Sequence, residues 1–513
     1  FVPEGGIWMN TQRPEWNDAN NALVGNGISM VTLYYLRRFV EFFNSLLEKT
    51  DLISVEISSE LNKFFNDISF ALNKNKKVLD TLISDSDRKK IVDSLGQAGS
   101  NYRDTIYDSS FSGTKSAIGI KEIKELLQLL LKYIDHSIDS NKRSDKLYHA
   151  YNLLTIDKDN ISISHLPEML EGQVAVLSSG YLSSKENLEV LDALKSSKLF
   201  REDQYSYILY PDKNLGLFLE KNNIASSKVK ESKLLSKLLN DGNNQIVSQD
   251  CEGSFHFNCD FNNVNGLISE LNLLPKKYNE LVKEEYNNIL EIFEDVFNHK
   301  EFTGRSGTFF GYEGLGSIYW HMVSKLSLAV LETTKKAISE KDNAVIGRFF
   351  DHYFEILEGI GVNKSPELYG AFPTDPYSHT PAGKGAQQPG MTGQVKEDVI
   401  SRFGELGVEV NNGIISFNSE MLRDQEFLTT NETFRYVNLS KEKIELNVNV
   451  NSLCFTYCQV PIIYSKSSSK KITIDFIDGR SVSIQGNELD IDSSRSLFDR
   501  ENIIKQINVS VIK

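Results

Sequence analysis

The chain has 513 residues with a net charge of −14, and 40% of its residues are apolar while 25% are charged. This length is sufficient for two or three domains with a large buried core, and the composition is ordinary for a soluble globular protein. The negative charge argues against nucleic acid or an anionic membrane surface as a partner, and no apolar run approaches the roughly 20 residues that a membrane span needs.

The first residue is Phe1, and the opening FVPEGGIWMN lacks the basic and apolar regions of a secretory signal peptide. We therefore expect a processed chain or a part of a longer one. The four cysteines, Cys251, Cys259, Cys454 and Cys458, lack the repeated close spacing of a zinc site and are too few for a disulfide scaffold. We expect reduced, buried thiols in a cytoplasmic protein, and no bound metal.

The first unusual segment is the loop over residues 3–27, which contains RPEWNDANNALVGNG. Trp16, Asn17 and Asp18 follow one another in it, before a run of small and amide residues. An aspartate in this setting is most often a helix cap or a turn residue. Long Gly-rich loops in a helical domain are usually functional, so the acid of an active site is the alternative.

Helical periodicity dominates the chain up to about residue 400. Ser29 is expected to cap a helix whose apolar residues recur at helical spacing, namely Leu33, Leu36, Val40, Phe43 and Leu47. Further amphipathic stretches predict helices over residues 52–74, 86–95, 120–138, 184–196, 265–298 and 317–340. This alternation of helices and long polar loops suits either a helical toroid or a plain bundle.

Two further Gly-rich loops, over residues 303–326 and 371–398, carry aromatic, amide and charged residues. The three tryptophans of the chain lie in the first two of these loops: Trp8 and Trp16 in the first, and Trp320 in the second. A tryptophan ring suits both the apolar face of a sugar and a hydrophobic core. The clustering of all three beside amides and carboxyls favours the sugar.

The second and third loops contain groups suited to an anion at expected helix starts. A helix start and an imidazole can both hold an anion at His321, although an isolated histidine is more often a core residue. The segment GMTG offers the hydroxyl of Thr392 and the backbone N–H of Gly393 to an oxyanion, and a simple Gly-rich turn is the alternative. Neither segment is a Walker or dinucleotide motif, so nucleotides are not implied.

After about residue 405 the hydrophobic period changes to two. Apolar residues alternate with polar ones at Ile444, Leu446, Val448 and Val450. The segment KITIDFIDGRSVSIQG predicts a hairpin that turns at Asp478 and Gly479, and INVSVIK predicts a last strand. We therefore predict a mainly α protein, with a helical domain over residues 1–404 and a small antiparallel β-sandwich domain over residues 405–513.

The tripeptide W-N-D over residues 16–18 resembles the loop that carries the general acid in inverting glycoside phosphorylases of the cellobiose phosphorylase type, in glycoside hydrolase family 94. The resemblance implies this role for Asp18. The fold of that family is an (α/α)6 barrel followed by a small C-terminal β domain, the same order as the two periodicities found here. We therefore expect an (α/α)6 toroid with a helical insertion somewhere within residues 50–300.

The other two loops resemble the phosphate-binding motifs of the same family, in the same order. The Gly-rich segment from Gly314 to His321 is similar to the motif whose histidine contacts phosphate. Thr392 and Gly393 are similar to the Thr-Gly pair that also holds phosphate, before a helix that leads into the terminal strands. The resemblance covers these three motifs and, loosely, the C-terminal domain.

Several features depart from the compact disaccharide phosphorylases. The spacing from Asp18 to His321 is larger, and GAQQPGMTGQVKE and GSIYWHMVSKL look more like the large relatives that phosphorolyse β-1,3-gluco-oligosaccharides. Glu313 stands where the compact enzymes tend to have a basic residue. The family also has a β-sandwich, several barrel helices and a phosphate-binding arginine before the W-N-D loop. The resemblance therefore implies a toroid that is incomplete at its N-terminal side, in a chain that is the C-terminal part of such an enzyme.

The activity implied by the resemblance is phosphorolysis of a β-glucosidic bond, β-1,3 in preference to β-1,4, with release of glucose 1-phosphate. Asp18 would protonate the glycosidic oxygen, and phosphate held by His321, Thr392 and Gly393 would attack the anomeric carbon. The residues expected to bind sugar are Arg13, Trp16, Asn17, Glu313, Trp320 and Gln388. Inorganic phosphate is a co-substrate, and no cofactor is expected. The other expected partners are a β-gluco-oligosaccharide, an N-terminal portion of the same enzyme and, as an option, a second copy in a homodimer.

Two other functions are open at this point. A hydrolase on the same fold would need a second catalytic carboxylate, for which Glu4, Glu15 and Glu313 are available. A non-catalytic carbohydrate-binding or scaffold subunit would need no acid. Dependence on phosphate separates phosphorolysis from hydrolysis, and replacement of Asp18 by asparagine separates both enzymes from a binding subunit.

Overall fold

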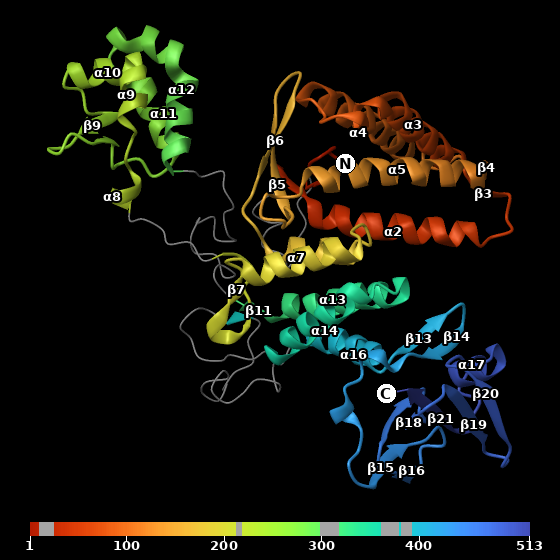
Figure 1. Cartoon of the computed structure of the whole chain (residues 1–513). Coiled ribbons are helices and arrows are strands. Elements are labelled where there is room, and N and C mark those ends of the chain that lie inside the picture. The colour runs from red at the N-terminus through yellow and green to blue at the C-terminus, as the bar shows by residue number, and fades with distance from the viewer. Residues whose placement is uncertain (10–24, 212–217, 298–317, 361–378, 381–391, 513) are drawn as a thin grey trace.

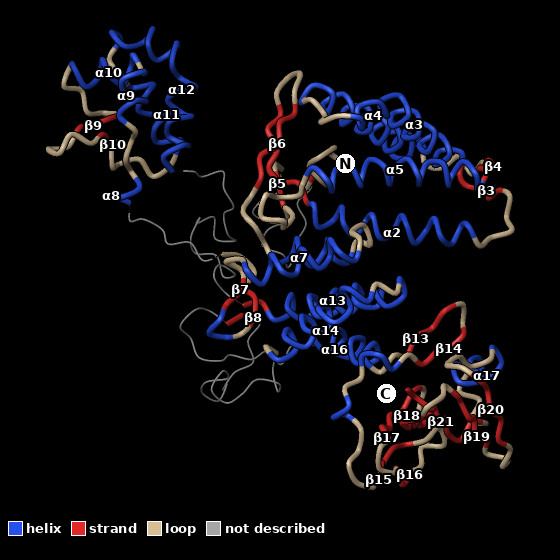
Figure 2. The backbone as a smooth tube through the Cα atoms, in the orientation of Figure 1, coloured by secondary structure: helices blue, strands red, loops and turns tan. Residues whose placement is uncertain are grey.

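The structure is a computed structural model that describes residues 1–9, 25–211, 218–297, 318–360, 379–380 and 392–512. About half of the chain is helical, and several small sheets accompany the helices (Figures 1 and 2). The described residues form a helical body, a smaller helical unit over residues 218–297 and a C-terminal β domain. This organisation agrees with the prediction of a mainly α protein that has a β domain at its C-terminal end.

Four helices of the body lie side by side in one layer, in the order α2, α6, α13 and α16. Their bounds are Met30–Glu48, Leu170–Ser178, Trp320–Glu340 and Thr392–Glu405. The helices α5, α7 and α14 pack on this layer and span Ile120–Ser140, Ser184–Ser196 and Asn343–Glu358. As predicted, Ser29 caps α2, and its Oγ accepts a hydrogen bond from the backbone N–H of Thr32 at 3.0 Å.

Charged side chains of three helices of this layer act on a tyrosine of the fourth. The carboxylates of Glu171 on α6, Glu332 on α13 and Glu397 on α16 all act electrostatically on the hydroxyl of Tyr35 on α2. Burial, reinforced by these carboxylates, raises the pKa of Tyr35 to about 12. The helices that the structure describes form an open two-layer arrangement without a barrel, so the (α/α)6 toroid stays a prediction.

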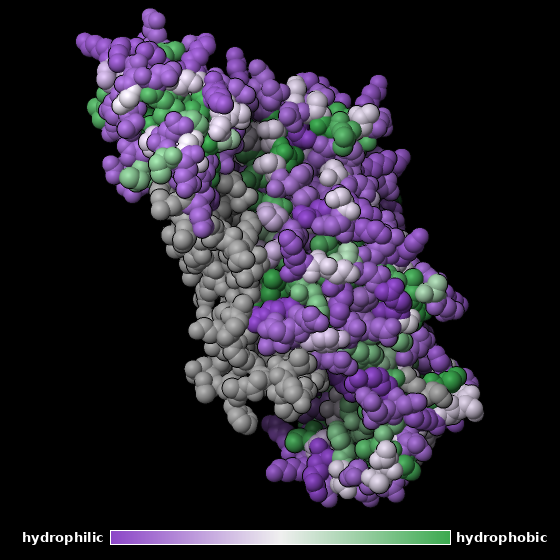
Figure 3. Space-filling view, turned by 60° about the vertical axis from the view of Figure 1, so that its left-hand side comes forward, coloured by the Kyte–Doolittle hydropathy of each residue, from purple (hydrophilic) through white to green (hydrophobic). Residues whose placement is uncertain are grey.

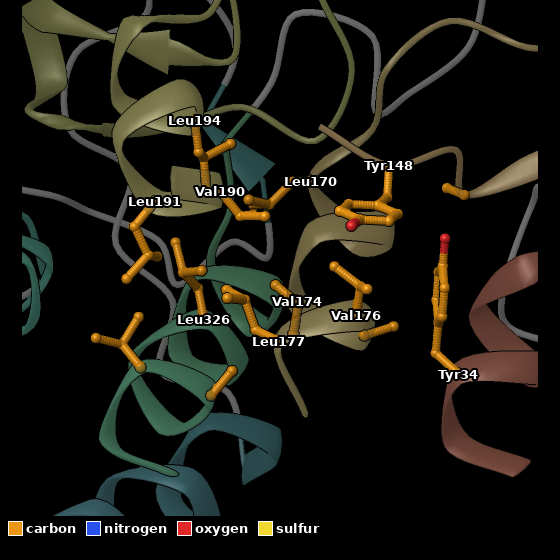
Figure 4. Packing of buried hydrophobic residues seen from close by; sticks show 14 of the residues in the cluster. Tyr34, Tyr148, Leu170, Val174, Val176, Leu177, Val190, Leu191, Leu194 and Leu326 are labelled. Carbon is orange, nitrogen blue, oxygen red and sulfur yellow. The ribbon is translucent and has the colours of Figure 1, made fainter. Parts of the chain in front are cut away.

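Helix α6 lies at the centre of the main hydrophobic core (Figure 4). The buried residues around it, including its own, are Tyr34, Tyr148, Leu170, Val174, Val176, Leu177, Val190, Leu191, Leu194 and Leu326. Nearly every residue of the segment LEGQVAVLS is buried. A helix enclosed on all sides has no polar face, which explains why an amphipathic pattern does not predict it.

A four-stranded antiparallel sheet lies beside α2, in the order β1-β2-β5-β6. Its strands span Ile7–Trp8, Gly27–Ser29, Tyr151–Ile156 and Ile161–His165. The sequence does not predict this sheet, because two of its strands are too short for a period and the sheet joins segments far apart in the chain. Strand β1 lies within the first loop, residues 3–27, and β2 begins at the last residue of that loop.

A helical hairpin of α3 (Ser59–Asn75) and α4 (Asp85–Ser109) shares a small apolar cluster with α5. The helix predicted over residues 52–74 begins later than expected, because β3 (Ser54–Ser58) pairs with β4 (Lys115–Gly119). The helix predicted over residues 86–95 extends much further, to Ser109. The strands β7 (Phe200–Arg201) and β8 (Ser206–Tyr207) form a short pair after α7.

Residues 218–297 form a unit with a hydrophobic core of its own, whose buried members all lie between Ile224 and Phe293. Its helices α8 to α12 span Phe218–Lys221, Ser226–Glu231, Lys233–Asn240, Val264–Leu273 and Asn279–Phe297. Strands β9 (Val247–Gln249) and β10 (Phe255–Phe257) pair beside them. The single helix predicted over residues 265–298 is therefore two helices, separated at Pro275, since proline disfavours helix continuation.

The C-terminal domain contains a five-stranded sheet in the order β17-β18-β21-β19-β20. These strands span Ser452–Tyr457, Val460–Ser467, Ile504–Ile512, Lys471–Phe476 and Ser481–Gln485. The predicted hairpin turns at Asp478 and Gly479, where Gly479 has a φ of +89°. The prediction of a purely antiparallel domain is wrong, because β18 and β21 run parallel in the middle of the sheet.

Smaller elements complete the C-terminal domain. They are the hairpin of β13 (Val408–Asn411) and β14 (Ile414–Phe417), the hairpin of β15 (Glu432–Val437) and β16 (Lys443–Val448), and helix α17 (Ile491–Phe498). Helix α17, which lies between β20 and β21, allows the chain to return and place β21 parallel to β18. The predicted period-two segment from Ile444 to Val448 is strand β16.

The cysteines are free thiols, but Cys251 and Cys259 are exposed and Cys454 and Cys458 only half-buried, so the expectation of buried thiols is wrong. Burial raises the pKa of the Cys454 thiol to about 12. Within the described ranges, no helix combines the length and apolar character needed to cross a bilayer. Hydrophilic residues cover most of the face in Figure 3, and apolar residues are scattered among them.

Candidate active site at the starts of two parallel helices

Two short strands bring the end of the second loop beside the third loop. Strand β11 (Ile318–Tyr319) pairs with β12 (His379–Thr380), so that Ile318 lies opposite Thr380 and Tyr319 opposite His379. Helix α13 begins directly after β11. The pairing therefore places the start of α13 next to the segment that leads to α16.

Helices α13 and α16 pack against each other and run in the same direction. His321 in the first turn of α13 lies against Glu397 of α16, and Leu331, further along α13, lies against Gly404. A Cβ on Gly404 would lie 2.3 Å from Leu331 Cδ2, so glycine is needed for this close approach. Both helix N-termini therefore lie on the same side of the body, where their backbone N–H groups favour an anion.

The described ends of the first loop lie near that side as well. Helices α2 and α13 both begin toward the strands β5, β7 and β11, on the left of Figure 1. The loop leaves β1 and returns at β2, directly before α2, and the indole Nε1–H of Trp8 donates to the carbonyl of Gly25 at 2.9 Å. The three loops singled out in the sequence thus begin or end around the same end of the helix layer.

His321 lies between a carboxylate and a phenol. Its Nε2 is 3.6 Å from Oε1 of Glu397, and its Nδ1 is 3.4 Å from the hydroxyl of Tyr319. About a quarter of the His321 side chain is exposed (26%), whereas Nε2 itself is buried. The accessible part of the ring is therefore not the nitrogen that faces Glu397.

The charges around His321 are mixed. Burial lowers the pKa of His321 below its usual range, and the positive charges of Lys325 and Lys396 lower it further, while Glu397 opposes them. Burial, together with the charge of Glu397, raises the pKa of Asp398. Two lysines thus supply local positive charge at this end of an acidic protein, and Glu397 supplies the counter-charge.

Trp320 lies at the start of α13, directly before His321. Its side chain is fully buried and belongs to the main hydrophobic core. A place for Trp320 beside a sugar subsite stays a prediction.

The other predicted site residues are described in part or not at all. Thr392 and Gly393 begin α16, which is the helix start that the sequence predicts for them. The remaining residues lie outside the described part of the chain, and they are Arg13, Trp16, Asn17, Asp18, Glu313 and Gln388. Their roles stay predictions.

Glu4 is one of the three residues named above as a second catalytic carboxylate for a hydrolase, and its carboxylate is held by other residues of the helical body. Its Oε2 forms an ion pair with Arg88 at 2.6 Å, and its Oε1 accepts the backbone N–H of Ile83 at 2.9 Å. Both charged side chains are less than a tenth exposed, so Glu4 has a structural role. The other two carboxylates named for a hydrolase, Glu15 and Glu313, lie outside the described residues.

Sequence reasoning missed Glu397, Lys325 and Lys396. Glu397 follows Thr392 by five residues within VKED, a run that reads as the solvated face of a helix. Only the packing of α16 on α13 buries Glu397 against His321. No group of three or more histidine, cysteine, aspartate or glutamate side chains suited to a metal occurs within the described residues.

Comparison with known families concerns the separate helical unit. Residues 215–300 match the family model of the GH149 phosphorylase insertion domain 2. The matched segment contains α8 to α12 and ends just before the loop that leads to His321. This match supports a glycoside phosphorylase at a coarse level, and with it a transferase of carbohydrate metabolism. No curated protein matches the chain.

Proposed function

We propose that this protein is an inverting phosphorylase of β-gluco-oligosaccharides, with a preference for β-1,3 linkages, that releases glucose 1-phosphate. The observation that carries the proposal is the match of residues 215–300 to an insertion domain of a phosphorylase. The three loop motifs, which resemble the general-acid and phosphate-binding motifs of related enzymes, support it. The linkage preference rests on the resemblance of the second and third motifs.

The chemistry needs one acid and one anion site. Asp18 donates its proton to the glycosidic oxygen as the bond from that oxygen to the anomeric carbon breaks. A phosphate oxygen attacks the anomeric carbon from the opposite face and forms the new bond, which inverts the configuration. Because phosphate is itself a nucleophile, no second carboxylate is required to activate water.

The anion site is supported by the arrangement of α13 and α16. His321 and the pair Thr392 and Gly393 belong to the starts of two parallel helices, whose N-terminal ends favour negative charge. Lys325 and Lys396 add positive charge nearby. We assign phosphate to this end of the helix pair, and sugar binding to Arg13, Trp16, Asn17, Glu313 and Gln388.

The decisive assay compares laminari-oligosaccharides and cello-oligosaccharides, each with and without inorganic phosphate. We expect glucose 1-phosphate only when phosphate is present, and faster with the β-1,3 substrates. Release of free glucose without any acceleration by phosphate would instead establish a hydrolase, and no turnover of either substrate would favour a binding subunit. Faster reaction with the β-1,4 substrates would overturn the linkage preference alone.

The role of Asp18 is tested by Asp18→Asn. We expect kcat to fall by about 10²–10⁴-fold, which is the usual contribution of a positioned general acid. The matched control is Asp93→Asn, which changes an exposed aspartate on α4 and should leave kcat unchanged. Equal activity of the two variants would remove Asp18 from the mechanism.

A further inference from the structure

Glu397 lies against His321 where the two parallel helices begin. Its side chain is only 5% exposed, and its Oε1 lies 3.6 Å from Nε2 of His321. Within the described part of the chain, neither Nε2 of His321 nor Oε2 of Glu397 has a hydrogen-bond partner, although both atoms are buried. Buried polar atoms are nearly always satisfied, so a nitrogen and a carboxylate this close are natural partners.

We propose that Glu397 is the positioning residue of His321. Its carboxylate accepts the proton on Nε2, fixes that tautomer and favours the doubly protonated ring, so that Nδ1–H is left to donate to an oxyanion. This inference rests on the proposed function, in which His321 holds phosphate. Glu397 acts through the histidine and does not itself touch the substrate.

The need for a carboxylate follows from the chemistry of imidazole. With a single proton on Nε2, the neutral ring presents a lone pair at Nδ1, which repels an oxyanion. The imidazolium form donates from both nitrogens. Nδ1 points away from Glu397 and lies 3.4 Å from the hydroxyl of Tyr319, which is a long hydrogen bond. An oxyanion that accepts Nδ1–H takes the place of this hydroxyl. A charge that stabilises the imidazolium form therefore strengthens an anion site.

The other groups around His321 disfavour its imidazolium form, so the opposite charge of Glu397 is needed to stabilise it. Lys325 on α13 and Lys396 on α16 both disfavour a positive charge on His321, as does burial, and Glu397 opposes all three. Tyr35 on α2 is close enough to Glu397 for the two to interact electrostatically, and its phenol is neutral at physiological pH. Tyr319 on β11 completes the surroundings of the ring.

The first test observes His321 directly and does not depend on activity. The protein has eight histidines, so selective ¹³C and ¹⁵N labelling gives few signals, and His321→Gln assigns the relevant one. In the wild type we expect the neutral ring to carry its proton on Nε2. In Glu397→Gln the pKa of His321 should fall by at least about one unit, which is the effect of removing an opposite charge at this distance.

Two further variants control for structural damage. Asp398→Asn removes the same charge from the neighbouring residue of α16 and should leave the titration of His321 within a few tenths of a unit. Glu397→Asp keeps the charge on a shorter side chain and should restore most of the wild-type pKa. The proposal is overturned if Glu397→Gln and the wild type share one tautomer and one pKa for His321.

The second test measures the KM for phosphate against pH. At low pH both proteins hold the imidazolium form and should have the same KM. Above both pKa values, the KM of Glu397→Gln should exceed that of the wild type about tenfold, because one pKa unit is a tenfold change in the imidazolium population. A changed pKa with an unchanged KM would keep the role of Glu397 and contradict the contact of His321 with phosphate.

Discussion

Among single residues, a buried ion pair and a stacked pair of histidines have roles that the sequence around them does not predict. Glu4 lies in the first loop, yet its carboxylate forms a buried ion pair with Arg88. The guanidinium of Arg88 also donates to the carbonyls of Pro3 and Ile161. The rings of His149 and His165 stack with their centroids 4.1 Å apart. Both arrangements join segments that are distant in the chain, and both make stability depend on charge.

Replacement of Arg88 by alanine should lower the free energy of unfolding by about 3–5 kcal/mol, because it leaves the buried carboxylate of Glu4 without its arginine partner. The control is Arg435→Ala, which removes an ion pair with Glu445 whose two side chains are mostly exposed. That change should be close to neutral, since exposed pairs contribute little. Thermal and urea unfolding measure both, and equal effects would contradict the structural role of Arg88.

The stability of the helical body should fall as the pH is lowered from about 6.5 toward 4. Burial, assisted by the neighbouring His165, lowers the pKa of His149 to about 4 from 6.5. Between pH 6.5 and 4, the unfolded chain therefore binds a proton at His149 that the folded chain does not bind. The free energy of unfolding is thus highest above pH 6.5 and decreases below it. After discounting for partial exposure, the loss is at most about 2 kcal/mol.

Melting temperatures at pH 7 and pH 4.5 test this dependence. His149→Gln should lose less stability between the two pH values than the wild type. His256→Gln should not share this effect, because hydrogen bonds to the carbonyl of Asn222 and the carboxylate of Asp250 raise the pKa of His256, which therefore favours folding at low pH. If the melting temperature falls equally between pH 7 and pH 4.5 in the wild type and in His149→Gln, His149 is not the cause of the pH dependence.

At the scale of elements, the approach of α16 to α13 decides the geometry of the candidate site. Gly404 permits this approach because Leu331 occupies the space that a side chain would need. The same packing buries Glu397 against His321. The predicted helix start at Thr392 is correct, but the amphipathic pattern alone does not say which helix α16 meets.

Gly404→Ala should destabilise the body by about 1–3 kcal/mol, the usual effect of overfilling a packed core. It should also raise the KM for phosphate, since it displaces α16 from His321. Gly347→Ala is the matched control, because Gly347 lies in α14 with open space around it, and there alanine should stabilise the helix by about 0.5–1 kcal/mol. Melting temperatures that shift in the same direction would contradict this account of the helix contact.

At the scale of the whole molecule, the unit over residues 218–297 is organised around its own core. Glu285 of α12 accepts hydrogen bonds from the backbone N–H groups of Lys233 and Leu234, at 2.7 and 3.0 Å, and so binds the start of α10. All buried apolar residues of this cluster belong to the unit itself. The segment is also the one that matches a phosphorylase insertion domain.

A polypeptide of residues 215–300 should therefore fold without the rest of the chain. We expect a helical circular-dichroism spectrum, dispersed amide signals and one cooperative unfolding transition, as for other small domains with a complete core. Glu285→Ala should lower its stability markedly, whereas Glu284→Ala, which removes an exposed partner of Lys233, should not. A spectrum without cooperative unfolding would show that the unit depends on the helical body.

The amino-acid sequence alone predicts the features that depend on neighbouring residues. The cap at Ser29, the helices with one apolar face, the split between helical and period-two regions, and the turn at Gly479 all follow from local spacing and backbone preference. The order of the three loops was also sufficient to suggest a glycoside phosphorylase. None of these inferences needs to know which elements pack together.

Other features depend on long-range packing, and only the three-dimensional structure shows them. Helix α6 is buried on nearly every side, so its sequence carries no amphipathic pattern, and Trp320 lies in the main core. The fold paired β18 with β21 in parallel across more than thirty intervening residues. It also turned Glu397 from a residue of a solvated helix face into the partner of His321. Burial and charge pairing depend on which surfaces meet in three dimensions, and hydrophobic spacing along the chain does not encode that choice.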